Sequence, residues 1–246
     1  MTDSPQLSLV MPAYNEGTTI EEVIYRVDNV VRQTGLKYEL IVVDDGSVDD
    51  TRKKAVNYAN NNGHVKVVSY KKNIGKGHAI KTGFANAKGD VVVFMDSDLD
   101  IDPRLIIRYA EALKDGDLAI ASKQHPYSKV KMPLMRSFLS RGFNVLVKLL
   151  TGLRISDTQT GLKAVRRSSF KEVFSKLAVK RYAFDVELLV IANLRGMKIV
   201  ELPVHANINV PFSLREIWRM FIDLLGITYR LRVSKYYSSA CIADEN

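Results

Sequence analysis

Asp96-Ser97-Asp98-Leu99-Asp100-Ile101-Asp102 follows the apolar run Val91-Val92-Val93-Phe94-Met95 and precedes Pro103. A short valine-rich run that starts after Gly89 and Asp90 predicts a buried strand. The acidic residues therefore lie where a strand ends and a loop begins. In open α/β sheets, ligands bind at this carboxyl edge of the strands. The stretch thus indicates both an α/β fold and the place of its functional site.

The spacing of Asp96 and Asp98 indicates a metal site. Residues two apart on extended backbone point to the same side of the strand. Two carboxylates held together suit Mg²⁺ or Mn²⁺, which keeps open positions for substrate phosphates. The alternative is a solvated acidic turn that caps a helix beginning near Pro103. For Asp100 and Asp102, an acidic turn is at least as good an interpretation as metal binding. For Asp96 and Asp98 we favour the metal.

Length and composition describe a globular protein with an anionic partner. The 246 residues are 46% hydrophobic, which suits one large domain or one domain with an appendage. The single cysteine, Cys241, excludes a disulfide framework within the chain and fits a reducing compartment. We expect neither a signal peptide nor a membrane span. The net charge of +9 suits nucleic acid, acidic lipid headgroups or a phosphorylated substrate.

Strands and helices alternate through the first half of the chain. Strands are expected at residues 7–11, 40–43, 65–68, 91–95 and 118–121, each apart from the last followed by a helix. This alternation predicts a mainly parallel sheet with right-handed crossovers. In the second half, helices are expected at residues 133–150, 184–194 and 214–233, a polar loop at 156–161 and a strand at 198–204.

Three polar loops follow predicted parallel strands, at residues 12–16, 44–47 and 96–102. Because the carboxyl ends of parallel strands share one edge, the three loops together describe a site. The carboxylate of Asp45 suits an N–H of a nucleobase, and Tyr14 suits packing beside a base or ribose. The alternative for Asp45 is a role in the turn and as a helix cap.

A basic, glycine-containing loop adds positive charge near the same edge. Lys72 and Lys76 flank Gly75 at the start of a predicted helix, which suits a pyrophosphate. The pattern is neither a P-loop nor a dinucleotide fingerprint, and the alternative is a solvated basic turn.

Four segments resemble, in order and spacing, the GT-A fold glycosyltransferases of family 2. They are Pro12-Ala13-Tyr14-Asn15-Glu16, Val42-Val43-Asp44-Asp45-Gly46-Ser47, Asn73-Ile74-Gly75-Lys76-Gly77 and Met95-Asp96-Ser97-Asp98. The resemblance covers about residues 7–204 and implies an α/β, Rossmann-like fold with a mainly parallel sheet flanked by helices. It implies nucleotide-sugar contacts at Pro12, Tyr14, Glu16, Val43, Asp45, Lys76, Asp96 and Ser97, and Mg²⁺ or Mn²⁺ on Asp96 and Asp98.

The second half narrows the resemblance. Residues 136–144 and 156–163 resemble the dolichyl-phosphate mannose and glucose synthases, and residues 157–159 are closer to the glucose branch. This implies transfer of a hexose from UDP- or GDP-hexose to a dolichyl or other polyprenyl phosphate. The chain departs from the pattern at Asp100, where mannose enzymes often carry Gln or Ser. It also departs at Lys123, where the family usually has arginine; lysine keeps the charge but lacks the bidentate fork.

Arg136, Ser140 and Asn144 are spaced four apart and therefore share one face of a predicted helix. An arginine and a hydroxyl on one face suit a phosphate acceptor, and the alternative is a solvated face. With the resemblance, we expect direct displacement at the anomeric carbon with inversion. Asp98, Lys123, Arg136 and Ser140 are the expected catalytic residues.

Asp185 and Glu187 leave an alternative open. A phosphate acceptor is already an anion and needs no general base, so we interpret these carboxylates as structural or as orienting the ribose or the acceptor. A family 2 enzyme with a hydroxyl acceptor would use one of them as base. The alternative from a different class is a basic nucleic-acid-binding protein. The chain lacks a recognised nucleic-acid motif, and its acidic strand ends would repel a phosphate backbone, so we expect no nucleic acid partner.

The C-terminal segment predicts a basic amphipathic helix. Its apolar stripe consists of Leu214, Ile217, Trp218, Phe221, Leu224, Leu225 and Leu231. Such a helix lies in a membrane interface or packs on its own domain. We therefore divide the chain into a catalytic domain, 1–211, and a helix with tail, 212–246. The expected location is peripheral, at the cytoplasmic face of a membrane.

Overall fold

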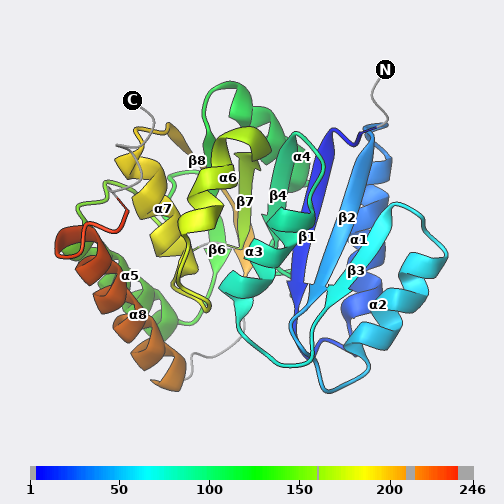
Figure 1. Cartoon of the computed structure of the whole chain (residues 1–246), viewed down its shortest axis with the longest axis horizontal. Coiled ribbons are helices and arrows are strands. Elements are labelled where there is room, and N and C mark those ends of the chain that lie inside the picture. The colour runs from blue at the N-terminus through cyan, green and yellow to red at the C-terminus, as the bar shows by residue number, and fades with distance from the viewer. Residues whose placement is uncertain (1–3, 160, 209–213, 238–246) are drawn as a thin grey trace.

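The computed structural model describes residues 4–159, 161–208 and 214–237. Its centre is a sheet with helices on both faces (Figure 1). The strands are β1 (Leu7–Ala13), β2 (Tyr38–Asp44), β3 (Val65–Ser69), β4 (Val91–Met95), β5 (Leu118–Ser122), β6 (Lys129–Lys131), β7 (Leu162–Arg166), β8 (Ile199–Pro203) and β9 (His205–Asn207). The helices are α1 (Ile20–Arg32), α2 (Thr51–Asn60), α3 (Lys76–Asn86), α4 (Leu105–Glu111), α5 (Leu134–Thr151), α6 (Arg167–Lys176), α7 (Phe184–Leu194) and α8 (Leu214–Arg232).

The large sheet confirms the predicted α/β fold. Its seven strands run in the order β3-β2-β1-β4-β7-β5-β8, and β6 and β9 form a separate small sheet. Only β7 is antiparallel to its neighbours in the large sheet, so this sheet is mainly parallel. Because Met95 pairs with Leu162, the start of β7 lies at the edge where β4 ends. The loops after β1, β2 and β4 therefore meet the loop before β7.

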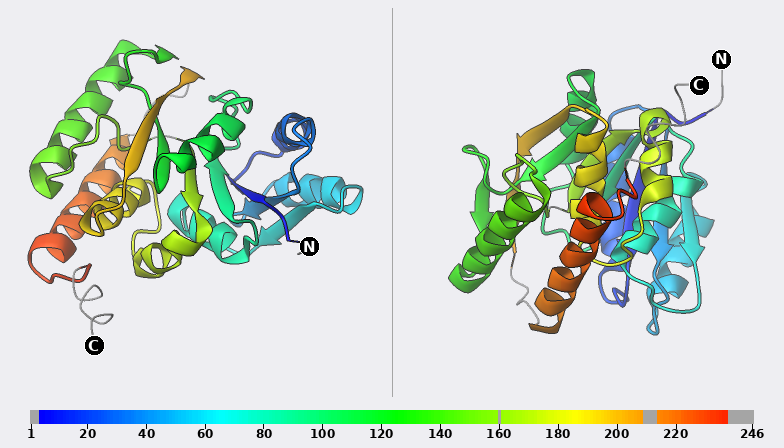
Figure 2. Two further views of the ribbon diagram at one scale, coloured as in Figure 1. Left: turned by 90° about the horizontal axis from the view of Figure 1, so that it is seen from above. Right: turned by 60° about the vertical axis from the view of Figure 1, so that its left-hand side comes forward.

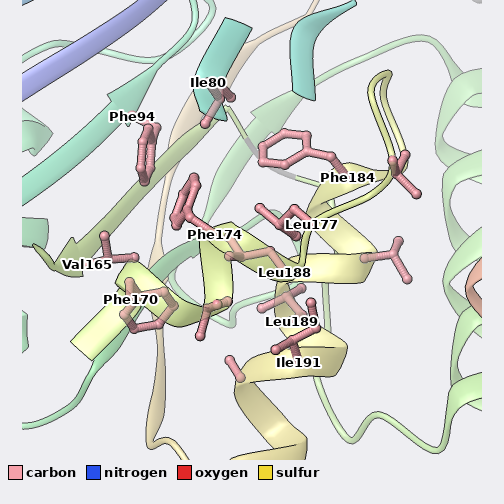
Figure 3. Packing of buried hydrophobic residues seen from close by; sticks show 14 of the residues in the cluster. Ile80, Phe94, Val165, Phe170, Phe174, Leu177, Phe184, Leu188, Leu189 and Ile191 are labelled. Atoms are coloured by element: carbon pink, nitrogen blue, oxygen red, sulfur yellow. The ribbon is translucent and has the colours of Figure 1, made fainter. Parts of the chain in front are cut away.

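Alternating side chains divide the core between the two faces of the sheet. Val92 and Phe94 of β4 pack in the cluster under α3, α6 and α7, whereas Val93 and Met95 pack in the cluster under α1, α2 and α4. Figure 3 shows Phe174 of α6 pointing toward Phe94, with their ring centroids 5.5 Å apart. The two apolar layers hold the sheet, and with it the loops at its carboxyl edge, in place.

The sequence analysis assigned no element to residues 162–176, where the structure has β7 and α6. The strand is short, and one of its central residues, Lys163, is polar in the sequence. In the structure Lys163 is buried, with its Nζ 2.8 Å from Asp185 Oδ1. A lysine in the strand interrupts its apolar run, and its buried position depends on Asp185 of another element. The hydrophobic pattern of the sequence therefore did not predict this strand.

Helices α5 and α8 lie side by side, away from the large sheet (Figures 1 and 2). The buried side of α8 places Leu224 and Ile227 in the core, while Trp218 and Ile222 on its other side are exposed. The helix therefore packs on its own domain and also presents an apolar side to solvent, and its contact with a membrane stays a prediction. The proposed boundary between residues 211 and 212 lies outside the described residues. Within the described part of the chain, no helix is both long enough and apolar enough to cross a membrane.

Candidate functional site

Two adjoining cavities open at the carboxyl edge of the large sheet. Their volumes are about 240 and 410 Å³. They share the lining residues Glu16, Lys76, Asp96, Asp98 and Tyr182, so they form one cleft with two compartments. Asp96 and Asp98 lie at the junction, where a group bound in one compartment meets a group bound in the other.

The smaller cavity brings together all but one of the predicted nucleotide contacts. Pro12, Tyr14, Glu16, Asp45, Lys76, Asp96 and Ser97 line it. Val43 is the exception, because it lines neither cavity and is fully buried in the core that α3 covers. Side chains alternate along a strand, and Val43 points to a covered face of the sheet rather than to its edge. The side chain of Val43 therefore supports the sheet, and a contact of this residue with a nucleotide stays a prediction.

Asp45 organises the loop that follows β3. Its carboxylate accepts hydrogen bonds from Tyr70 Oη at 2.6 Å, Asn73 Nδ2 at 3.0 Å, Ile74 N at 2.9 Å and Gly75 N at 2.9 Å. Burial raises the pKa of Tyr70, and so does the hydrogen bond that Tyr70 donates to Asp45. The Tyr70 hydroxyl therefore stays protonated. The structure therefore shows Asp45 shaping the wall of the cavity, and its contact with a nucleobase stays a prediction.

The Asp96 and Asp98 pair fits a divalent cation. Lys76 Nζ lies 2.7 Å from Asp96 Oδ2. Burial, and then repulsion from Asp96, raises the pKa of Asp98 to about 6. Two crowded carboxylates in a half-closed cleft gain from a cation between them. In the described parts of the chain, no group of three or more His, Cys, Asp or Glu side chains could hold a metal ion. A cation on the pair would therefore complete its coordination with oxygens of a ligand or water.

Local backbone geometry explains why the pair stands at this junction. Asp96 N donates to the carbonyl oxygen of Gly161, which precedes β7. A Cβ at Gly161 would lie 2.4 Å from Asp96 Oδ2, so any other residue here would displace that carboxylate. Leu99, directly after the pair, has a φ of 55°, a strained value for a leucine and one that is common beside functional sites. The sequence analysis missed the role of Gly161, although this glycine closes the polar loop at residues 156–161.

The larger cavity collects the predicted acceptor residues Lys123, Arg136 and Ser140. Lys123 Nζ lies 3.0 Å from Asp157 Oδ2, a fully buried carboxylate that also accepts the Lys123 backbone N–H. Burial lowers the pKa of Arg136, and the nearby charge of Asp100 partly offsets this. Lys123 and Arg136 thus bring two cationic groups, and Ser140 a hydroxyl, into a compartment that carboxylates also line, and these three groups suit a bound phosphate.

Asn144 does not share the role of Arg136 and Ser140. It is buried, and its Oδ1 accepts hydrogen bonds from Thr158 Oγ1 at 2.7 Å and Thr158 N at 3.2 Å. Asn144 therefore fixes the loop at residues 156–161 to α5 and supports the wall of the cavity.

The structure separates the remaining carboxylates. Asp100 and Asp185 line the larger cavity, whereas Asp102 and Glu187 line neither cavity. Asp102 binds the guanidinium of Arg104, which matches the alternative of an acidic turn. Burial raises the pKa of Asp185, which also pairs with a buried lysine of β7. Of the two candidate bases, only Asp185 reaches the cleft.

This cleft on a mainly parallel sheet, with a carboxylate pair between two compartments, defines a GT-A-like glycosyltransferase. The chain belongs to glycosyl transferase family 2, whose family model matches residues 8–174. The predicted resemblance is confirmed, and the protein is a glycosyltransferase. The family assignment favours this enzyme over the nucleic-acid-binding alternative.

Similar proteins include a dolichyl-phosphate beta-glucosyltransferase of Homo sapiens, 37% identical over 93% of this chain and 77% of that protein. A dolichol-phosphate mannosyltransferase of Pyrococcus furiosus is 33% identical over 92% of this chain and 63% of that protein. A solved structure of glucosyl-3-phosphoglycerate synthase from Mycobacterium tuberculosis, with Mn²⁺, UDP and phosphoglyceric acid, is 25% identical, with a TM-score of 0.69. That match covers 92% of this chain and 78% of the other.

Proposed function

We propose that the protein transfers a hexose from a UDP- or GDP-hexose to dolichyl phosphate or another polyprenyl phosphate. The position of Asp96 and Asp98 between the two cavities carries this proposal. One cavity has the lining expected for a nucleotide, and the other contains two cationic side chains and a hydroxyl, Lys123, Arg136 and Ser140, that suit a phosphate. The relatives with dolichyl-phosphate in their names support the lipid acceptor.

The residues of the smaller cavity would bind the donor. Asp96 and Asp98 would hold Mg²⁺ or Mn²⁺, which stabilises charge on the departing diphosphate when it is bound. Lys76, now paired with Asp96, would add positive charge to the same diphosphate. Tyr14 and Asp45 would contact the nucleoside, directly or through the loop that Asp45 shapes. Donor binding would thus fix the anomeric carbon at the junction of the cavities.

The residues of the larger cavity would bind the acceptor. Lys123, Arg136 and Ser140 would orient the acceptor phosphate so that one of its oxygens faces the anomeric carbon. That oxygen forms the new bond to carbon as the bond to the nucleoside diphosphate breaks on the opposite side, which inverts the configuration. The phosphate oxygen is already anionic and needs no base.

Glucose from UDP-glucose is the first donor to test. Residues 157–159 are closer to the glucose branch, and the human relative is a beta-glucosyltransferase. The solved relative binds UDP together with Mn²⁺. Mannose from GDP-mannose is the second donor, in view of the Pyrococcus relative.

One observation favours a second function within the same family. Asp185 lines the larger cavity, and its raised pKa suits a general base for a hydroxyl acceptor. Its ion pair with Lys163, at 2.8 Å, weighs against this role, because it holds the carboxylate away from a substrate proton.

We also infer that the protein binds peripherally at the cytoplasmic face of a membrane, where a polyprenyl phosphate would lie. The α5–α8 apolar surface, defined here as Leu134, Met135, Phe138, Trp218 and Ile222, is exposed. It belongs to the two helices that supply Arg136, Ser140 and Met220 to the larger cavity. Docking of this surface would bring that cavity to the level of the lipid headgroups.

A transfer assay with the full-length protein tests the proposal. Radiolabelled UDP-glucose and GDP-mannose are each offered with dolichyl phosphate or with dolichol, in Mn²⁺, Mg²⁺ or EDTA. We expect a metal-dependent glycolipid from dolichyl phosphate and none from dolichol. Transfer to dolichol that is lost in Asp185→Asn would instead establish the hydroxyl-acceptor function.

A further inference from the structure

Glu187 of α7 is a fully buried carboxylate outside both cavities. Its Oε2 accepts the backbone N–H groups of Ala178 at 2.8 Å and Val179 at 2.7 Å. Its Oε1 accepts the hydroxyl of Tyr237 and lies 3.1 Å from Arg230 Nη2 of α8. One carboxylate therefore joins the segment before α7 to the C-terminal part of the described chain.

Arg230 and Tyr237 also bind each other. Arg230 Nε donates to Tyr237 Oη at 2.8 Å, so the three side chains close a ring of contacts. Tyr237 is buried in the same hydrophobic cluster as Leu224 and Ile227 of α8. Tyr237 is thus held by packing as well as by hydrogen bonds, and Arg230 by its contacts with Tyr237 and Glu187.

The segment that Glu187 holds, residues 178–182, packs closely against the start of α3. His78 N donates to the carbonyl oxygen of Lys180 at 3.0 Å. A Cβ at Gly75 would lie 2.5 Å from that same oxygen, so the two backbones are closer than side chains would permit. Movement of the segment would therefore displace the loop that contains Gly75.

Both partners in this contact belong to the wall of the smaller cavity. Gly75 and Lys76 line it from the α3 side, and Arg181 and Tyr182 line it from the segment. Lys76 in turn pairs with Asp96 at the junction of the cavities. A continuous series of contacts thus runs from α8, through Glu187, to the compartment proposed for the donor.

We propose that Glu187 is a positioning residue for the donor: Arg230 and Tyr237 fix it, and it fixes residues 178–182 against Gly75 and Lys76. Nucleotide affinity then depends on how α8 is seated, although α8 supplies no residue to the smaller cavity. This inference rests on the proposed binding of a nucleotide diphosphate in that cavity. It assigns Glu187 no contact with substrate and no role as a base.

Glu187→Gln should keep the contacts of this side chain with residues 178–179 and disturb those with Arg230 and Tyr237. The amide oxygen still accepts the two backbone N–H groups, but the amide NH₂ then faces the donors of Arg230 and Tyr237. We expect UDP to bind at least tenfold more weakly in the presence of Mn²⁺, measured by calorimetry on the full-length protein. The KM for dolichyl phosphate should rise less than the Kd for UDP, although α8 also supplies Met220 to the larger cavity. An equal rise in both constants would overturn the inference.

Two further variants distinguish positioning from a loss of folding. Tyr237→Phe removes one hydroxyl and should weaken UDP binding about threefold. Glu172→Gln is the matched control, because it breaks another carboxylate–arginine pair, with Arg195, at residues that line neither cavity. The control should bind UDP as the wild type does. Circular dichroism and the melting temperature report folding for each protein.

The outcomes for the inference and for the proposed function differ. Failure of the wild type to bind UDP or GDP with Mn²⁺ would overturn the proposed function and this inference with it. A wild type that binds UDP, beside folded Glu187→Gln and Tyr237→Phe proteins with unchanged affinity, would overturn only the inference. If Glu187→Gln does not fold, the affinity of Tyr237→Phe decides.

Discussion

Asp98 shows at the scale of one residue how burial prepares a carboxylate for a cation. Its neighbour Asp96 lies 2.7 Å from the ammonium of Lys76, whereas Asp98 accepts the backbone N–H of Asp100 at 3.0 Å. Burial and the charge of Asp96 raise the pKa of Asp98 to about 6. A divalent cation would lower the cost of keeping both carboxylates ionised.

Asp98→Asn should therefore lower Mn²⁺-dependent UDP binding by at least tenfold and reduce transfer by about a hundredfold or more. Calorimetry and the transfer assay measure the two effects. Asp102→Asn is the matched control, since Asp102 belongs to the same loop but binds Arg104 and lines neither cavity. Full activity of Asp98→Asn, or of the wild type in excess chelator, would contradict the metal site.

Asp28 of α1 is a buried carboxylate with a structural role. It accepts hydrogen bonds from Tyr38 at 2.5 Å, His64 at 2.6 Å, Tyr58 at 3.0 Å and Arg32 at 2.6 Å. Burial alone would raise the pKa of Asp28, but the bonds from Tyr38, His64 and Tyr58 outweigh it and lower the pKa. The folded state therefore prefers the ionised form, and ionisation stabilises the fold.

Asp28→Asn should lower the free energy of unfolding by about 2 kcal/mol at neutral pH, in line with the loss of hydrogen bonds to a charged group. Because the pKa is lowered on folding, this contribution is present above the ordinary value of 3.8 and is lost as the pH falls through the folded value. Urea unfolding at a series of pH values measures it. The difference from the wild type should narrow below pH 3.8.

An exposed ion pair on the same helix provides the control for this prediction. Glu22 and Arg26 are four residues apart on α1, with side chains 60% and 58% exposed. Glu22→Gln should change the free energy of unfolding by no more than about 0.5 kcal/mol at any pH. A pH-independent loss in Asp28→Asn would mean that packing, and not ionisation, explains its effect.

At the scale of the element, α5 illustrates how one helix serves two surfaces. Arg136 and Ser140 face the larger cavity, whereas Leu134, Met135 and Phe138 are exposed. The helix ends at Gly152, whose φ of 78° provides the left-handed cap. Its rigid frame therefore fixes the distance between a proposed phosphate site and a proposed membrane surface.

Arg136→Ala should impair use of the lipid phosphate more than binding of the donor. Loss of one charge-assisted contact costs about 1.5–3 kcal/mol, so kcat/KM for dolichyl phosphate should fall about 10- to 150-fold. The Kd for UDP with Mn²⁺ should change less than threefold. Arg141→Ala on the same helix is the control, because Arg141 is exposed and lines neither cavity. Equal losses for donor and acceptor would refute the assignment.

The sequence predicts the elements whose pattern is local, and it misses those that depend on distant partners. The run at residues 91–95 and the acidic pair after it predicted a buried strand and a ligand site at its carboxyl edge, where the structure has the cleft. The insertion of β7 between β4 and β5 could not be read, since it depends on strand pairing between distant segments. The same holds for Gly161, because only the structure shows that a side chain at this position would displace the carboxylate of Asp96.

At the candidate site too, the sequence predicted what depends on local spacing and missed what depends on distant contacts. The spacing of Arg136 and Ser140 placed both in one cavity, but the same spacing grouped Asn144 with them although it binds Thr158. The sequence left Glu187 either a structural or orienting role or, with a hydroxyl acceptor, the role of a base. Its partner Tyr237 is 50 residues away, and no local pattern indicates that contact.

At the scale of the whole molecule, exposed apolar side chains of α5 and α8 distinguish one side of the protein. The α5–α8 apolar surface lies on helices set apart from the sheet (Figure 2), and α8 also carries Arg215 and Arg219. With a net charge of +9, the protein should prefer anionic to neutral lipid. Each basic residue near an anionic surface contributes about 1 kcal/mol to binding.

The full-length protein should therefore sediment with vesicles of phosphatidylserine and phosphatidylcholine, and less with phosphatidylcholine alone. Trp218→Glu places a charge on the α5–α8 apolar surface, where the side chain is 64% exposed, and should reduce both sedimentation and transfer to vesicle-borne dolichyl phosphate. Transfer to a short, water-soluble polyprenyl phosphate should be unaffected, because Trp218 lines neither cavity.

A point substitution is a sharper test of this docking than removal of α8, because Leu224 and Ile227 of that helix are fully buried and their loss would destabilise the core. Tyr25→Glu is the matched control, since Tyr25 is 58% exposed on α1, which covers the other face of the sheet. It should sediment as the wild type does. If Trp218→Glu and Tyr25→Glu bind vesicles equally, the acceptor reaches the larger cavity by a route that does not involve α8.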